Sequence, residues 1–200
     1  TVIDALFEVT EKLEKDKELS ASLAANFPFL RLDMRMILVT GHRRESFGGG
    51  FERICEALAI TAKAHPDCQI LYPVHLNPNV QEPVKRILKD VDNVHLIEPQ
   101  QYLPFVYLMN RSYIILTDSG GIQEEATSPI IRKKVLVVRK TTDRPESVEN
   151  QLAEIVGLNE KNITNSIKKT MKNPKLHSKK TPFGKGDASE KILNILKKSF

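Results

Sequence analysis

Residues 36–50 read MILVTGHRRESFGGG and pass from an apolar run, through two arginines, to three consecutive glycines. A near-continuous apolar run of this kind is typical of a strand that is buried on both faces of a parallel sheet. The residues that follow, Phe51–Ala64, have helical spacing of their apolar side chains. Strand, glycine-rich loop and helix together predict one unit of a parallel sheet that is covered by helices.

The same alternation continues along the rest of the chain. It predicts an α/β domain with a Rossmann-like parallel sheet and helices on both faces. The segment 173–187 is rich in Pro, Gly and Lys and is expected to be a surface loop. The expected strands are Met34–Thr40, Gln69–Pro73, Val94–Ile97, Tyr113–Thr117, Lys134–Val138 and Glu154–Val156. The expected helices are Thr1–Ala25, Phe51–Ala64, Asn79–Asp90, Gln101–Asn110, Gly121–Ala126, Lys161–Lys172 and Ala188–Lys198.

The composition limits the class of protein. With 200 residues, 40% of them hydrophobic, the chain can build one well-buried core. No apolar run approaches the roughly 20 residues of a membrane span, and Cys55 and Cys68 lack the spacing of a zinc or redox site. We therefore expect a cytoplasmic protein with two core cysteines, no metal and no cofactor. Much of the net charge of +5 lies in late lysine pairs with few aromatics among them, which argues against a nucleic acid partner.

The loop at residues 41–50 has the features of an anion site. Its glycines let the backbone approach a ligand, the following helix start offers free N–H groups, and Arg43 and Arg44 add full charges. The glycines run consecutively, so they do not fit the dinucleotide-binding pattern GxGxxG. The loop suits a diphosphate, and the alternative is a flexible turn with solvated arginines.

A second polar loop follows the fourth expected strand and reads DSGGIQEE over residues 118–125. Ser119 and the amides of Gly120 and Gly121 could cradle phosphate oxygens, while a carboxylate one turn later could take the two hydroxyls of a ribose. The alternative is a capped helix whose acidic residues stabilise its dipole.

Three more loops are expected at the same place, because the carboxyl ends of parallel strands share one edge of the sheet. His75 follows the second strand. Gln100 and Phe105 follow the third and could hold a base by amide hydrogen bonds and ring contact. Arg139 and Arg144 follow the fifth. Cations, amides and helix starts on one edge predict a nucleoside-diphosphate site whose ligand is a sugar nucleotide.

Four blocks in this chain resemble the signature of a known family. They read MILVTGHRRESFG (36–48), YPVHLNP (72–78), DSGGIQEE (118–125) and TTDRPE (141–146), and they run in order over essentially the whole chain. The chain resembles the carboxyl-terminal half of the non-hydrolysing UDP-N-acetylglucosamine 2-epimerases of bacteria. The resemblance implies one half of a glycosyltransferase-B-like two-domain architecture. It also implies an activity, the interconversion of UDP-N-acetylglucosamine and UDP-N-acetylmannosamine by elimination and re-addition of UDP, for surface polysaccharides.

The resemblance further implies roles for the matching residues. His42 would bind the diphosphate and assist the departing UDP as the catalytic residue. Arg43 and His75 would help to form a second, regulatory UDP-N-acetylglucosamine pocket. The remaining expected contacts are Gln100 and Phe105 on the uracil, Ser119, Gly120 and Gly121 on phosphate, Glu125 on the ribose and Arg144 on the diphosphate charge.

Two segments depart from the family pattern. Residues 127–134 (TSPIIRKK) replace a turn that contains glycine, and residues 149–152 (ENQL) replace a Gly-Thr stretch. A turn that needs a positive φ would be strained in residues 127–134, because this segment contains no glycine.

The resemblance also divides the chain into parts. Residues 1–30 would be the linker helix from an absent amino-terminal domain, 31–185 the UDP-binding domain and 186–200 a carboxyl-terminal helix. The family's sugar-directed carboxylates and lysine lie mainly in the absent domain, so we expect no epimerisation by this chain alone. The expected partners are a UDP-sugar and either a second copy or a separately encoded amino-terminal half. The alternatives are a sugar-nucleotide-binding or oligomerising module without catalysis, and a glycosyltransferase-B-type transferase, against which the His-Arg-Arg-Glu block argues.

Overall fold

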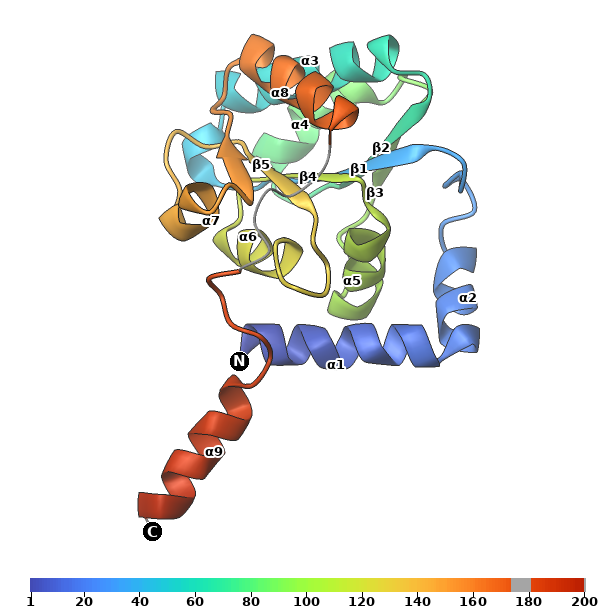
Figure 1. Cartoon of the computed structure of the whole chain (residues 1–200). Helices are drawn as coiled ribbons and strands as arrows, with labels where there is room; N and C mark the ends of the chain where they lie inside the picture. Colours follow the sequence, from blue (N-terminus) through green and yellow to red (C-terminus); the bar gives the residue numbers. More distant parts are fainter. Residues whose placement is uncertain (174–180, 200) are drawn as a thin grey trace.

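The computed structural model describes residues 1–173 and 181–199 (Figure 1). Within them lies a six-stranded sheet with the order β3-β2-β1-β4-β5-β6, and every neighbouring pair of strands is parallel. This order, with helices on both faces, confirms the predicted Rossmann-like fold. The strands are β1 (Arg35–Thr40), β2 (Cys68–Pro73), β3 (Val94–Ile97), β4 (Ile114–Thr117), β5 (Lys134–Val137) and β6 (Ala153–Ile155).

The helices form two layers, one on each face of the sheet (Figure 1). Five of them contribute to the two buried clusters most clearly: α3 (Gly49–Ala64), α4 (Pro78–Leu88) and α8 (Glu160–Lys172) on one face, and α1 (Val2–Lys15) and α5 (Tyr102–Arg111) on the other. The remaining elements are α2 (Lys17–Ala25), η1 (Arg44–Ser46), α6 (Gly120–Ala126), α7 (Pro145–Glu149) and α9 (Ala188–Ser199). Figure 1 shows α9 standing away from the two layers.

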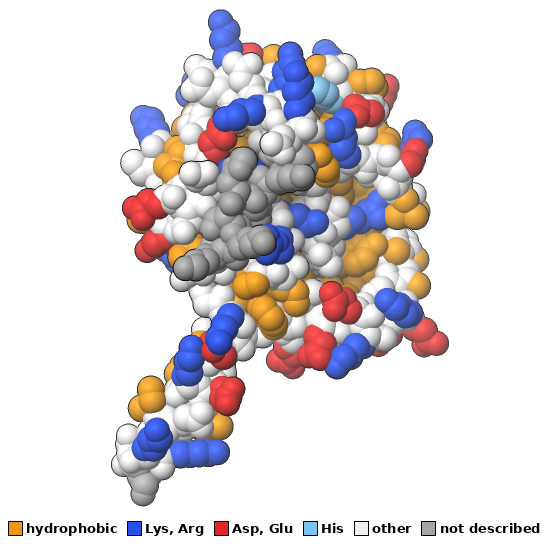
Figure 2. Space-filling view, in the orientation of Figure 1, with side chains coloured by type: hydrophobic (Ala, Val, Ile, Leu, Met, Phe, Trp, Pro, Cys, Tyr) orange, Lys and Arg blue, Asp and Glu red, His pale blue; other side chains and the backbone are white. Residues whose placement is uncertain are grey.

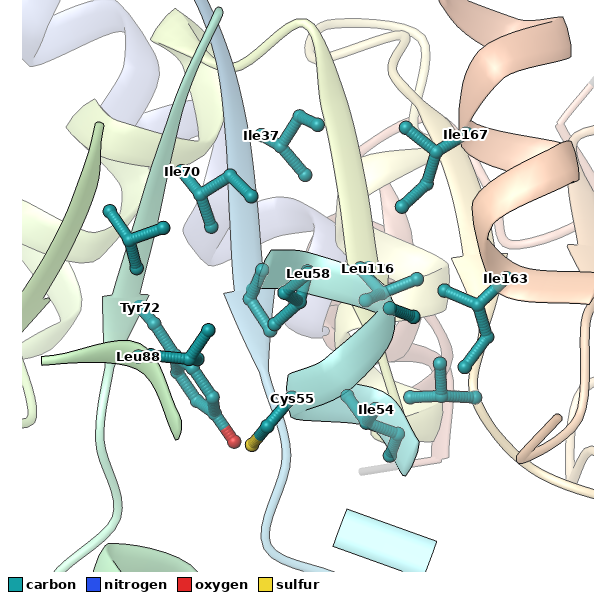
Figure 3. Packing of buried hydrophobic residues seen from close by; sticks show 14 of the residues in the cluster. Ile37, Ile54, Cys55, Leu58, Ile70, Tyr72, Leu88, Leu116, Ile163 and Ile167 are labelled. Atoms are coloured by element: carbon teal, nitrogen blue, oxygen red, sulfur yellow. The ribbon is translucent and has the colours of Figure 1, made fainter. Parts of the chain in front are cut away.

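The sheet is buried on both faces because its strands alternate apolar side chains between two cores. In β1, Ile37 belongs to the core under α3 and α8, whereas Leu38 belongs to the core under α1 and α5. Figure 3 shows Ile37 in the first core, facing side chains from α3 and α8. Each fully buried aliphatic side chain contributes about 1.5–3 kcal/mol to folding. Cys55 and Cys68 are both buried free thiols, as predicted.

The prediction of one helix over Thr1–Ala25 is wrong, because the chain breaks at Asp16. This residue has an extended backbone (φ −94°, ψ 92°), and its carboxylate accepts a hydrogen bond from the N–H of Leu19 at 2.9 Å. An aspartate at the position before a helix satisfies a backbone donor that the new helix leaves free. The segment is therefore two helices, α1 and α2, that run in different directions (Figure 1).

Two exposed residues have the left-handed backbone that favours glycine. Arg132 has a φ of 53° and Gln151 a φ of 57°. Arg132 lies in the segment for which strain is predicted, so the positive φ on which that prediction depends is present there. Gln151 lies in the other segment that departs from the family pattern.

The end of the chain is described only in part. The carboxyl-terminal helix is confirmed as α9, but residues 174–180 of the predicted loop, with the pair Lys179-Lys180, lie outside the described residues. Within residues 1–173 and 181–199, we find no helix with the length and apolarity needed to cross a membrane.

Candidate functional site

The candidate site begins where the strand order reverses. β1 and β4 lie side by side, but the chain leaves β1 toward β2 and leaves β4 toward β5. At the carboxyl ends of the two strands, Thr40 pairs with Thr117 and their hydroxyl oxygens lie 2.7 Å apart. In α/β sheets, ligands bind outside the carboxyl ends of the strands at such a reversal of the strand order.

The loop after β1 is held by a buried aspartate. One carboxylate oxygen of Asp118, Oδ2, accepts hydrogen bonds from the backbone N–H groups of His42 and Arg43, both at 2.7 Å. A Cβ on Gly41 would lie 3.4 Å from the Tyr72 hydroxyl and 3.5 Å from Asp118 Oδ2, which is ordinary van der Waals contact. The loop therefore passes close to the carboxylate.

The side chain of His42 lies in the loop after β1, beyond the carboxyl end of that strand. It is 49% exposed, and its ring stacks on that of His75 with centroids 5.2 Å apart and planes 14° apart. The structure thus brings together two of the predicted site residues, from the loops after β1 and β2.

A nearly buried arginine joins the loop after β1 to the loop after β5. The side chain of Arg139 is 7% exposed and donates to Glu45 at 2.6 Å and to Asp143 at 2.8 Å. Arg43 lies 3.4 Å from the same carboxylate oxygen of Asp143. The hydrogen bond from Arg139 holds the pKa of Asp143 below its usual range. Arg43 and Arg139 are therefore already paired with acids of the chain.

Arg144 lies over the turn that starts α6. A Cβ on Gly120 would be 3.7 Å from the guanidinium carbon of Arg144, and one on Gly121 would be 3.9 Å from the Ser119 hydroxyl. Arg144 also forms an ion pair with Glu124. The predicted phosphate-binding turn and the predicted diphosphate arginine are thus neighbours.

Glu125 connects α6 to the start of α5. Its carboxylate is 7% exposed and accepts a hydrogen bond of 2.8 Å from the hydroxyl of Tyr102, while burial raises the pKa of Glu125. Gln100 precedes Tyr102, and its amide donates to the Glu98 carbonyl at 2.8 Å. Phe105 lies in the first turn of α5 and packs partly into the core. The residues predicted to contact the base therefore lie at the start of α5, and the residue predicted to contact the ribose lies on α6, which Tyr102 joins to α5.

Four residues that hold these side chains in place are not among the predicted site residues. Asp118, Glu45 and Asp143 fix the cationic loops, and Tyr102 fixes Glu125. The available signal was the presence of acidic residues, near arginines, in the loops that follow β1, β4 and β5.

Comparisons with known proteins agree with this geometry. The family model described as UDP-N-acetylglucosamine 2-epimerase matches residues 1–197. The UDP-N-acetylglucosamine 2-epimerase of Yersinia pestis is 55% identical over 98% of this chain and 53% of its own length. The enzyme of that name from Escherichia coli K12 is 53% identical with the same coverage. The UDP-GlcNAc 2-epimerase structure from Neisseria meningitidis is 45% identical and superposes with a TM-score of 0.92 over 98% of this chain and 53% of that one.

These matches confirm the predicted architecture, in which this fold is one half of a glycosyltransferase-B-like arrangement. The chain spans about half the length of the curated relatives it matches. The match covers the loops after the strands as well as the core. The chain therefore belongs to the UDP-N-acetylglucosamine 2-epimerase family.

Proposed function

We propose that this chain is the UDP-holding half of an enzyme that interconverts UDP-N-acetylglucosamine and UDP-N-acetylmannosamine. The observation that carries the proposal is the meeting of His42, the turn at Ser119 and Arg144 on one edge of the sheet. The relative from Neisseria meningitidis was solved bound to UDP-GlcNAc, and the one from S. aureus with UDP. A ligand of the same class would place its diphosphate among these cations and amides.

We assign the ligand contacts by the elements that carry them. Ser119, Gly120 and Gly121 take phosphate oxygens, and Glu125, held by Tyr102, takes the ribose hydroxyls. A buried carboxylate is a strong acceptor for paired hydroxyls once a ligand completes its hydrogen bonds. Gln100 and Phe105 take the uracil, and Arg144 adds charge beside the phosphates. A second, regulatory pocket that includes Arg43 and His75 stays a prediction, as does a cytoplasmic location.

His42 assists the bond-breaking step. UDP leaves C1 of the sugar as the C2 proton is removed, which gives 2-acetamidoglucal, and UDP adds back after a proton returns to the other face of C2. The oxygen of the departing UDP gains negative charge in the transition state, so a protonated imidazole aimed at it stabilises that state more than the ground state. Loss of one such preorganised donor costs about 2.7–4 kcal/mol of activation free energy in other enzymes.

The bases that act on C2 belong to a second half in this proposal. The chain matches about half of its relatives' length, and α9 carries an uncovered apolar face. Its Ile192, Leu193, Ile195 and Leu196 are 49–64% exposed, and Figure 2 shows hydrophobic side chains along the projecting helix. An apolar helix face of this kind is stabilised by contact with another domain. In this proposal, residues 31–185 bind UDP, and residues 1–30 and 186–200 contact the second half. The alternative is that a second copy of this chain covers the apolar face of α9.

Calorimetry with UDP tests the nucleotide site. We expect saturable binding to the purified chain at millimolar UDP, and weaker but still measurable binding to His42→Ala and to Glu125→Ala. The controls are His65→Ala, at the opposite edge of the sheet, and Glu149→Gln, an exposed acid on α7, which should bind as the parent chain does. Absence of binding by the parent chain at millimolar UDP contradicts the proposal.

An activity assay tests the division between two halves. The purified chain should not convert UDP-N-acetylglucosamine, and the same chain mixed with the amino-terminal half of the Yersinia pestis relative should. Turnover by this chain alone would show that the second half is not needed. Binding of UDP with no turnover in either assay would favour the binding-module alternative.

A further inference from the structure

The second oxygen of the Asp118 carboxylate is buried and unsatisfied. Asp118 is 1% exposed, and its Oδ2 takes the two backbone N–H groups of the loop after β1. Among the described residues, no group donates a hydrogen bond to Oδ1. A buried carboxylate oxygen without a donor is costly, and most such oxygens are paired.

A side-chain nitrogen of His42 lies close to this oxygen. Its Nδ1 lies 3.8 Å from Asp118 Oδ1, too far for a hydrogen bond, and a movement of about 1 Å would bring it into range. One face of the His42 ring is covered by His75, whose own Nδ1 accepts the N–H of Asn77 at 3.1 Å. His75 is thus held in place, and His42 has its Nδ1 edge toward the buried carboxylate.

We propose that Asp118 is the positioning residue of His42, which it orients by accepting the Nδ1 proton, so that Nε2 is the nitrogen that meets the diphosphate. The Nε2 part of this statement rests on the proposed function; the contact between the two side chains does not. Asp118 would then act twice, through Oδ2 on the loop backbone and through Oδ1 on the ring.

The chemistry of the pair follows from this arrangement. A carboxylate that holds Nδ1–H keeps the proton on that nitrogen whether the ring is neutral or charged, and it stabilises the charged ring. When the C1–O bond breaks, its electron pair goes to the UDP oxygen, and that oxygen takes the Nε2 proton of His42. Re-addition reverses the transfer. Asp118 stays ionised throughout and touches no substrate atom.

The variant Asp118→Asn separates the two actions. The amide oxygen can still accept the two backbone N–H groups, but the NH₂ group would then face Nδ1 of His42 and donate to it. The neutral ring should therefore change from the Nδ1–H to the Nε2–H tautomer. Long-range ¹H–¹⁵N NMR of the full chain at about pH 8.5, where an ordinary imidazole is neutral, distinguishes the two forms. Unchanged backbone amide signals of His42 and Arg43 show that the loop is intact.

The tautomer of His42 in the two chains decides between the possible results. We expect the Nδ1–H form in the parent chain and the Nε2–H form in Asp118→Asn. An Nε2–H form in the parent chain, or the same tautomer in both, overturns the proposal; the first result needs no variant, so it stands even if Asp118→Asn does not fold. These spectra require no ligand, so a failure of UDP to bind would count against the proposed function alone.

Binding gives a second readout. Asp118→Asn should weaken UDP binding roughly 10-fold, the effect of one charge-assisted hydrogen bond. In a chain that already carries His42→Ala, the same change should alter the affinity less than about twofold, because residues that act through one another are not additive. An equal loss in both backgrounds would mean that Asp118 only supports the loop and would overturn the positioning role.

Discussion

Replacement of Gln151 by glycine should stabilise the fold. Gln151 follows α7 with a φ of 57°, and its N–H donates to the Val148 carbonyl at 2.9 Å. The next N–H, of Leu152, donates to the Ser147 carbonyl at 2.9 Å. This pair of bonds is the Schellman end of a helix, in which the residue with positive φ is usually glycine. Gln151 is exposed, so its side chain gives little packing in return.

The magnitude follows from two opposing terms. The left-handed conformation destabilises the folded state by about 1–2 kcal/mol for a residue with a Cβ. Glycine offsets about 0.4–1 kcal/mol of this gain, because it increases the conformational entropy of the unfolded chain. The net expectation for Gln151→Gly is a gain of about 0.5–1 kcal/mol in the free energy of unfolding, or a rise in Tm of about 1–4 °C for a chain of this size.

Urea unfolding followed by circular dichroism measures this gain, and a glycine two residues away provides the control. Glu149 is exposed and helical, so Glu149→Gly should cost about 0.5–1 kcal/mol. Gln151→Ala keeps the Cβ and should leave the urea midpoint nearly unchanged. If Gln151→Gly lowers the urea midpoint as far as Glu149→Gly does, the left-handed backbone at Gln151 does not destabilise the fold.

Three further predictions concern stability. Arg132→Gly, at the other left-handed position, should also raise the urea midpoint, by a similar amount, and a fall would show that its side chain contributes more than its backbone costs. Asn93→Ala should cost about 1–3 kcal/mol in thermal unfolding, because the amide donates to three backbone carbonyls between residues 62 and 68; an unchanged Tm would contradict this. Burial raises the pKa of Glu125 above its ordinary 4.5, so its contribution to stability is present below that value and lost as the pH rises through the raised pKa. Glu125→Gln, which can still accept from Tyr102, should therefore become more stable relative to the parent chain as the pH rises above 4.5; a constant difference in unfolding free energy would refute the assignment.

The sheet could be predicted well because its strands are buried on both faces. Such strands appear as continuous apolar runs, which few other elements produce. The weakest run, at Glu154–Val156, still marks a strand, found at Ala153–Ile155. The first helix could not be placed by periodicity alone, because one side chain at Asp16 ends one helix and starts the next. Local hydrogen bonding outweighed the spacing of apolar residues there.

The site could be predicted as an edge of the sheet but not as a set of contacts. Residue types at strand ends were enough to expect cations and amides on one edge. The acids that hold those cations are distant in sequence: Glu45 and Arg139 are 94 residues apart, and Arg43 and Asp143 are 100 apart. Only the strand order, with β4 between β1 and β5, brings them together, and no local pattern encodes that order.

These acid partners also determine what the arginines of these loops offer a ligand. Because Arg139 and Arg144 are already held by carboxylates of the chain, their positions are fixed during folding, and a ligand need not order them. The cost is that a diphosphate must compete for charge that is already compensated. Arg43 is the exception, since it is 41% exposed and its contact with Asp143 is the long one, 3.4 Å. An exposed ion pair of this kind holds its partners weakly. Of these three arginines, Arg43 can therefore leave its acid partner at least cost, while Arg139 and Arg144 stay paired.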